Sequence, residues 1–298
     1  MNSKSKHGLI ITAYQDIPFL IELLSLYSRY FNCYVHIDRK TKLDKFEKEK
    51  IKNIPNVVMI QKYKINWGSY KHILAIVELL KLAVNDNCEY FSVISANTVL
   101  VRHPKEVIDF FVENKDDIFM EIVSKDSLSE KNRFWAFDYR YSAFFFQHLY
   151  NVRSANKVYR KFVNINTEQM IAKFQQKLHL RNNVSFAYKG YVYCHFPRIA
   201  AKYVLNYLEE NKNYIRELKY CFVGEEFFFQ NIFMRMEFSG KVNNTSLIYD
   251  VWSEERGYPA NLNIEDLKEI EKDKFMFARK VASINREVFD EIRKVEKF

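Results

Sequence analysis

Short apolar runs alternate with longer amphipathic segments over the first 122 residues of the chain. The apolar runs predict buried β-strands over residues 8–13, 33–38, 57–61, 90–95 and 117–122. Between them, apolar residues at helical spacing predict helices over residues 17–31 and 42–52, a third that Ser69 could cap, and a fourth that Pro104 opens. This alternation predicts an α/β fold in which helices cover both faces of a mainly parallel sheet.

The carboxyl ends of these strands are the expected place for a ligand. In an open parallel sheet, ligands bind in the crevice beyond those ends. Here the edge would be formed by Ala13, Tyr14, Asp38, Ser95 and Glu121.

The rest of the chain continues without a linker rich in Pro, Gly or Ser. Residues 125–185 have weaker periodicity and many basic and aromatic side chains, with helices expected over 148–163 and 167–180. Helices follow over 198–210 and 225–236, then a strand over 247–252, a helix near 264–271 and an amphipathic helix from Arg286. We therefore expect one domain over residues 1–298.

Composition narrows the class of protein. The 298 residues are 48% hydrophobic, enough for a large core, but no apolar run reaches the length of about 18 residues that a membrane helix needs. Met1 to His7 is basic and leads only into a short strand, which predicts no signal peptide and a cytoplasmic protein. The four scattered cysteines predict reduced thiols. With six glycines and neither a GxGxxG nor a GxxxxGK[ST] motif, a dinucleotide-binding or P-loop protein is close to excluded.

The net charge of +9 indicates an attraction to anions. Nucleic acid, an anionic membrane surface and phosphorylated small molecules all fit that charge. Basic and acidic residues are interleaved, however, which is equally typical of an ordinary solvated surface.

Two adjacent acids, Glu225 and Glu226, open an apolar helix. Acids in a first turn complement the helix dipole, and a carboxylate that faces a cleft can also act as a general base. Asp38 ends a buried strand, where it could receive hydrogen bonds from a nucleotide or form a turn. From the residues alone, both readings stay open for each position.

Cations near the carboxyl end are candidates for phosphate binding. Arg279 and Lys280 follow a pair of aromatic residues, and Trp252 and Arg256 lie in a strand end and loop upstream. Such cations could clamp a diphosphate, or simply be solvated. The sequence has no Asp-x-Asp triplet and no metal-ligand spacing, so we expect no metal site and no cofactor.

Six segments in order resemble the core-2/I-branching N-acetylglucosaminyltransferase family, which includes the peptide xylosyltransferases. These segments are YVHIDRK, NWGSY, FSVISANTVLVR, YKGYVYCHFPR, VGEEFFFQNIF and FMFARKV, and the likeness covers nearly the whole chain. The resemblance implies a GT-A-like fold, a UDP-sugar donor and inverting transfer without a metal ion. It also implies that residues 1–122 are the nucleotide-binding half and 123–298 the acceptor-binding and catalytic half.

The resemblance assigns roles residue by residue. Glu226 falls on the family's catalytic glutamate and Lys280 on its diphosphate-binding lysine, with Arg279 as a helper and Arg256 as a second phosphate ligand. Asp38 falls on the residue that contacts uridine, next to Ala13 on the neighbouring strand end. The expected acceptor contacts are Glu121, Arg133, Tyr193, Trp252 and Glu225.

Two of the segments depart from the family pattern. The SGxDxP segment reads Ser95 to Leu100 without its Gly, Asp and Pro, and Tyr193 stands where the GSxW segment has Trp. These segments shape the sugar and acceptor subsites, so the resemblance carries the chemistry but not the specificity.

The resulting expectation is a transferase that extends a saccharide or lipid-linked oligosaccharide, in capsule, lipopolysaccharide or exopolysaccharide synthesis at the inner face of a bacterial membrane. The basic terminal helix would allow peripheral contact with anionic lipid, and no nucleic acid is expected as a partner. Two alternatives stay open, a non-catalytic binder of anionic glycans or nucleic acid, and a pseudo-enzyme that has lost activity with the altered segment.

Overall fold

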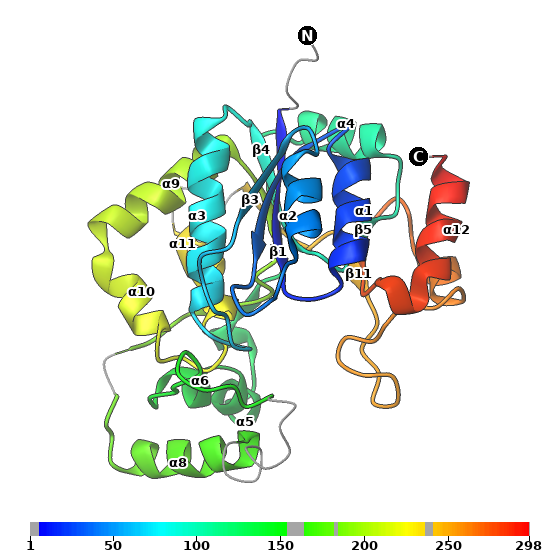
Figure 1. The fold of residues 1–298 in the computed structure, drawn as a ribbon. Coiled ribbons are helices and arrows are strands. Elements are labelled where there is room, and N and C mark those ends of the chain that lie inside the picture. Colours follow the sequence, from blue (N-terminus) through cyan, green and yellow to red (C-terminus); the bar gives the residue numbers. More distant parts are fainter. Residues whose placement is uncertain (1–5, 154–163, 182–183, 236–240, 298) are drawn as a thin grey trace.

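A seven-stranded sheet forms the centre of the fold (Figure 1). The computed structural model describes residues 6–153, 164–181, 184–235 and 241–297. The strands, in the spatial order β10-β6-β9-β4-β1-β2-β3, are β1 (His7–Ala13), β2 (Asn32–Ile37), β3 (Val57–Ile60), β4 (Tyr90–Ser95), β6 (Ile118–Met120), β9 (Cys194–Pro197) and β10 (Val242–Asn244). Neighbours are parallel except at β9, which is antiparallel to β4 and β6. The predicted α/β fold with a mainly parallel sheet is confirmed.

Helices cover both faces of this sheet. They are α1 (Ile17–Tyr27), α2 (Lys45–Lys52), α3 (Lys71–Asn85), α4 (Pro104–Glu113), α9 (Arg198–Glu210), α10 (Lys212–Leu218), α11 (Glu225–Phe233) and α12 (Arg286–Glu296). Helices α5 (Glu130–Arg133), α6 (Tyr139–Tyr141) and α8 (Ile165–Lys177) lie away from these faces. Alternate residues of β1 face opposite sides, as strand geometry requires. Leu9 and Ile11 pack with α1, α4 and α12, whereas Ile10 packs with α3, α9 and α11.

Two small sheets complete the structure. In the first, β11 (Ile248–Asp250) lies parallel to β12 (Phe277–Arg279), which is antiparallel to β5 (Thr98–Leu100). This register sets Asp250 beside Arg279. In the second, β7 (Val123–Ser124) pairs with β8 (Tyr188–Lys189). The described residues between these two strands form a lobe that carries α5, α6 and α8 beyond one end of the main sheet (Figure 1).

Most predicted elements of the first 122 residues are confirmed. Strand β4 has the predicted bounds, and Pro104 is the first residue of α4. The predicted helix over 148–163 is wrong at 148–153, which form turns and irregular chain, and its remainder lies outside the described residues. The helix expected near 264–271 is reduced to a 3-10 turn, Asp266–Glu269.

The cysteines and the helix lengths were also predicted from the composition of the chain. All four cysteines are buried and free, as expected for core thiols. Among the helices that the structure describes, none is both long and apolar enough to cross a membrane.

Candidate active site

The strand ends of β1 and β2 hold the residues expected to meet a nucleotide. Asp38 is buried, and its Oδ1 accepts hydrogen bonds from the backbone N–H groups of Lys40, at 2.8 Å, and Ile65, at 3.3 Å. The Lys40 contact makes the turn that the strand end predicted, and the Asp38 amide donates to the Ala13 carbonyl at 2.8 Å. Asp38 therefore holds the β2 end against β1, whether or not it also touches a ligand.

Glu226 lies in the first turn of α11, which begins after Gly224. Its Oε2 forms an ion pair with Arg140, and Lys189 Nζ lies 3.7 Å from the same oxygen. Arg140 and Glu226 are 86 positions apart in the sequence. A half-buried carboxylate held by two cations through one oxygen is therefore presented at the start of this helix.

Glu225 points to a different set of partners. Its Oε2 lies 2.9 Å from His72 Nδ1, and His72 Nε2 lies 3.0 Å from Thr12 Oγ1. This chain of contacts connects the start of α11 with α3 and with the end of β1. The two neighbouring acids thus have separate surroundings, and Glu225 fixes the position of the helix that presents Glu226.

Gly190 brings three parts of the site into close contact. Its N–H donates to the Glu226 carbonyl at 2.9 Å. A Cβ at this position would lie only 1.9 Å from the Glu121 carbonyl oxygen and 3.0 Å from Gln230 Nε2. A side chain is therefore excluded where the end of β6, the β8–β9 connection and α11 meet.

A group of acidic and aromatic side chains lies beside this contact. The Tyr191 hydroxyl donates to Asp250 Oδ2 at 2.8 Å, and the Tyr191 ring stacks on Trp252 with centroids 6.0 Å apart. Burial raises the pKa of Glu121, which Lys189 opposes and the charges of Asp250 and Glu226 reinforce. Burial likewise raises the pKa of Asp250.

Arg279 and Lys280 form the cationic side of the group. The Arg279 guanidinium lies 4.6 Å from the centre of the Tyr193 ring, and both cations interact electrostatically with Asp250. Burial lowers the pKa of Lys280, and the nearby charges of Arg279 and Arg153 lower it further. Within the described part of the chain, Arg279 Nε is buried without a hydrogen-bond partner. Such an atom is costly unless an acceptor reaches it.

The structure thus brings together most of the predicted residues but not all of them. The predicted residues with a recorded interaction in this neighbourhood are Glu121, Tyr193, Glu226, Trp252, Arg279 and Lys280. Arg256 instead forms a two-pronged ion pair with Asp266, with contacts of 3.0 and 2.5 Å. Arg133 is half-buried at the end of α5. Sequence reasoning missed Arg140, Lys189, Tyr191 and Asp250, none of which lies in a segment with a recognisable charge motif.

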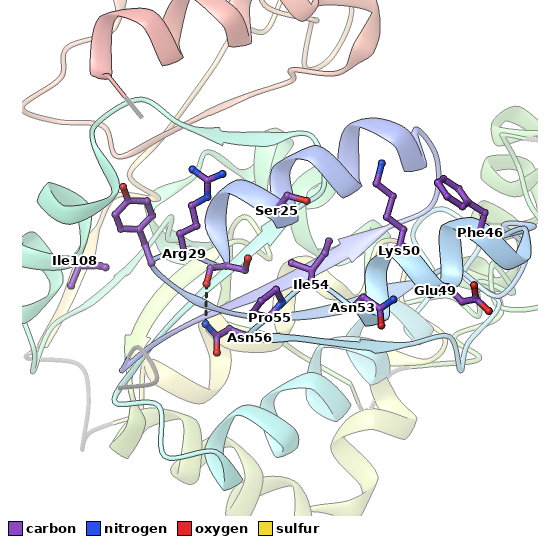
Figure 2. Close-up of a pocket in the computed structure, with 12 residues that line it drawn as sticks. Ser25, Arg29, Phe46, Glu49, Lys50, Asn53, Ile54, Pro55, Asn56 and Ile108 are labelled. Atoms are coloured by element: carbon purple, nitrogen blue, oxygen red, sulfur yellow. Dashed lines mark hydrogen bonds between the residues drawn. The ribbon is translucent and has the colours of Figure 1, made fainter. Parts of the chain in front are cut away.

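The structure has a small hollow near the predicted site and a larger one away from it. A small hollow of about 30 Å³ lies at the ends of β1 and β4, between Tyr14, Ser95 and Ala282. A hollow of about 1080 Å³ lies elsewhere, where Figure 2 shows Arg29, Asn53 and Asn56 on its lining, and it contains none of the predicted site residues among those described. Across residues 6–153, 164–181, 184–235 and 241–297, no three His, Cys, Asp or Glu side chains gather as a metal site needs.

An α/β sheet whose carboxyl edge carries a carboxylate, stacked aromatics and buried cations is suited to a group-transfer enzyme that acts on sugars and phosphates. The family model described as "Branch: Core-2/I-Branching enzyme" matches residues 9–274. The chain belongs to the core-2/I-branching enzyme family and is a glycosyltransferase with an α/β fold.

Other comparisons are more distant. Among curated proteins, no sequence matches the chain. Residues 1–349 of TarS from S. aureus, solved with UDP-GlcNAc, are 21% identical over 40% of this chain and 34% of that one, with a TM-score of 0.30. A putative glucose-1-phosphate thymidylyltransferase from Bacillus anthracis, solved with a sucrose, is 9% identical over 80% of this chain and 85% of that one, with a TM-score of 0.36. Neither structure is similar enough to assign a substrate or a mechanism to this chain.

Proposed function

We propose that the protein transfers a sugar from a UDP-sugar to a saccharide hydroxyl with inversion and without a metal ion, in bacterial surface polysaccharide synthesis. The observation that carries this proposal is a chain of charge interactions that leads from Glu226 through Glu121 and Asp250 to two cations. Of these cations, Arg279 is buried and Lys280 is half-buried. A base on one side of the anomeric carbon and cations for the leaving diphosphate on the other are what in-line displacement needs.

Glu226 is the proposed general base. Arg140 and Lys189 both contact its Oε2, so the acceptor hydroxyl would deliver its proton to Oε1. The same two cations would keep the carboxylate oriented during the reaction. A positioned base of this kind contributes roughly 10²- to 10⁴-fold to the rate.

Lys280 and Arg279 are the proposed ligands of the donor diphosphate. Burial and neighbouring cations lower the pKa of Lys280, so an arriving dianion would relieve an unfavourable charge and bind well. The buried Arg279 Nε would gain its missing acceptor. Asp38 and Ala13 would hold the uridine at the β1–β2 edge. Arg256 stays a predicted second phosphate ligand, and it would first have to leave Asp266.

The acceptor would bind on the side of Glu121, Tyr193 and Trp252. The exposed Trp252 ring, backed by Tyr191, offers a flat apolar surface to a sugar ring. Arg133 and Glu225 stay predicted acceptor contacts, although Glu225 already has His72 as a partner. The lipid-linked oligosaccharide acceptor and peripheral membrane contact belong to the same proposal.

A screen of UDP-sugars tests the proposed donor and the metal independence together. UDP release and thermal stabilisation are measured for each sugar nucleotide in parallel samples, one with EDTA and one with Mn²⁺ in its place. We expect at least one UDP-sugar to be hydrolysed slowly in EDTA. Activity that disappears in EDTA and returns with Mn²⁺ would contradict the metal-independent mechanism.

A further inference from the structure

Helix α8 turns its apolar side chains to solvent. Met170, Ile171, Phe174 and Leu178, the last just after the helix, are 65%, 48%, 63% and 53% exposed. Three of these lie at positions i, i+4 and i+8, which fall on one face of a helix. The opposite face, which is buried, carries Ala172 and Gln175. A helix with this arrangement presents its apolar stripe outward, the reverse of an ordinary surface helix.

Polar contacts fix the rotation of α8 in this orientation. Gln175 Oε1 accepts from the Phe144 N–H at 2.9 Å, while its Nε2 donates to the Phe144 carbonyl at 3.2 Å. Gln176 Nε2 donates to Ser142 Oγ at 2.9 Å. Turning the apolar face inward would break these bonds, so its exposure is built into the packing.

Aromatic and basic side chains border the apolar face. Phe134 and Trp135, 38% and 44% exposed, lie in the π-helical turn Phe134–Asp138. Lys173 of α8 lies over the Trp135 ring, with Nζ 5.9 Å from its centre. Lys173 and Lys177 are both exposed. We call the four apolar residues of α8, together with Phe134, Trp135, Lys173 and Lys177, the α8 face.

The terminal helix α12 has no exposed apolar stripe comparable to that of the α8 face. Its apolar residues Val288, Phe289 and Ile292 are buried in the core. Arg286 and Arg293 form ion pairs with Glu22 of α1. Apart from the exposed Val295, the apolar side chains of α12 are therefore already used in folding, whereas those of the α8 face are not.

We propose that the α8 face is the surface by which the protein attaches to an anionic membrane. Apolar side chains that enter the headgroup region, with lysines beside them and a tryptophan at the border, are the composition of an interfacial helix. Long lysine side chains can reach anionic headgroups while their stems stay on the apolar surface. The net charge of +9 on the whole chain also attracts the protein to an anionic membrane.

Charge argues against a second copy of the chain as the occupant. A two-fold interface places the same patch against itself. Lys173 and Lys177 would then bring a basic border against a basic border, which anionic lipid would instead neutralise.

Arg140 connects the α8 face with the proposed base. Trp135 and Arg140 belong to one continuous helical stretch, and Arg140 contacts Glu226. Attachment through Trp135 would therefore hold the acceptor side of the site near the membrane surface. This inference rests on the membrane contact in the proposed function and assigns a surface to it, and its test requires no catalytic turnover.

Vesicle co-sedimentation tests the proposal, using phosphatidylcholine vesicles with and without phosphatidylglycerol. The test variant is Met170→Gln/Phe174→Gln, and the matched control is Val112→Gln/Ile199→Gln, whose native residues are 64% and 63% exposed on α4 and α9. We expect the native chain and the control to bind the anionic vesicles, with weaker binding at high salt. The test variant should bind at least about tenfold more weakly.

A second readout uses Trp135 after Trp67→Phe and Trp252→Phe leave it as the one tryptophan of three. Its emission should shift to the blue with anionic vesicles and be quenched by brominated lipid. A native chain that stays in the supernatant, or a test variant that binds equally well, overturns the proposal. So does a native dimer that the test variant converts to a monomer. UDP release should be the same in test variant and control, so failure here is distinguishable from failure of the proposed reaction.

Discussion

A methyl group at Gly190 should separate the parts of the active site. The added Cβ would lie 1.9 Å from the Glu121 carbonyl oxygen, whereas ordinary contacts begin near 3.4 Å. Backbone must therefore move by about 1.5 Å, either at Glu121 or at residue 190 itself, whose N–H donates to the Glu226 carbonyl. A misplacement of about 1 Å can cost roughly 10²-fold in rate. Overpacking of this kind also costs about 1–3 kcal/mol of stability.

The assay compares Gly190→Ala with Gly8→Ala. A Cβ on Gly8 would meet the Phe91 ring at 3.1 Å, a milder clash on β1 with a side chain and not with backbone. Both variants should melt below the native chain, but only Gly190→Ala should lose kcat, by about 100-fold, for UDP-sugar hydrolysis. If folded Gly190→Ala keeps kcat within about threefold of the native chain, the close contact does not position the base.

Four further changes have defined outcomes. Lys280→Ala should lower kcat/KM for the donor by roughly 10²- to 10³-fold, because one charge-stabilising group is lost. Arg256→Gln should change kcat/KM for the donor by less than about threefold if the ion pair with Asp266 persists in the complex. A loss in kcat/KM as large as that of Lys280→Ala would instead identify Arg256 as a phosphate ligand. Burial raises the pKa of Glu121 above 4.5, so its charged form opposes folding at neutral pH. Glu121→Gln should therefore melt higher than the native chain at pH 7, with the difference vanishing near pH 4; no difference at pH 7 would contradict the burial argument. Burial lowers the pKa of His195 from 6.5 to about 4. Between these two pH values only the unfolded chain takes up the proton, so the stability of the native chain should fall as the pH falls from 6.5 to about 4. In urea titrations, His195→Gln should lose less stability over this pH range, and an equal loss in both chains would contradict His195 as the cause.

The sequence predicted the parallel half of the sheet because buried parallel strands are continuous apolar runs. It did not predict β9 or β12, which are short and whose partners lie far away in the sequence. The expected helix near 264–271 ends after one 3-10 turn, although Asn263 and Asp266 exchange the two hydrogen bonds of a capping box. Whether such short strands and helices form is decided by tertiary contacts and not by the local sequence.

The residues of the candidate site could likewise be predicted only in part. Asp38 and the acids at the start of α11 could be found because a strand end and a helix start are visible in the sequence. Arg140 and Lys189 could not, because nothing local relates them to Glu226. Their contacts exist only once β8 and the α5–α6 stretch are folded against α11.

The role of Glu226 is tested most directly by Glu226→Gln, measured beside Glu225→Gln as the matched neighbour. Both substitutions remove one charge in the same helical turn, so both should fold and bind UDP. With the UDP-sugar that the native chain hydrolyses and its acceptor, Glu226→Gln should lower kcat by about 10²- to 10⁴-fold. Glu225→Gln should lower kcat by far less, because the Gln side chain can keep the contact with His72 that holds the helix in place. Native turnover in Glu226→Gln, or an equal loss in both variants, would contradict the assignment of Glu226 as the base.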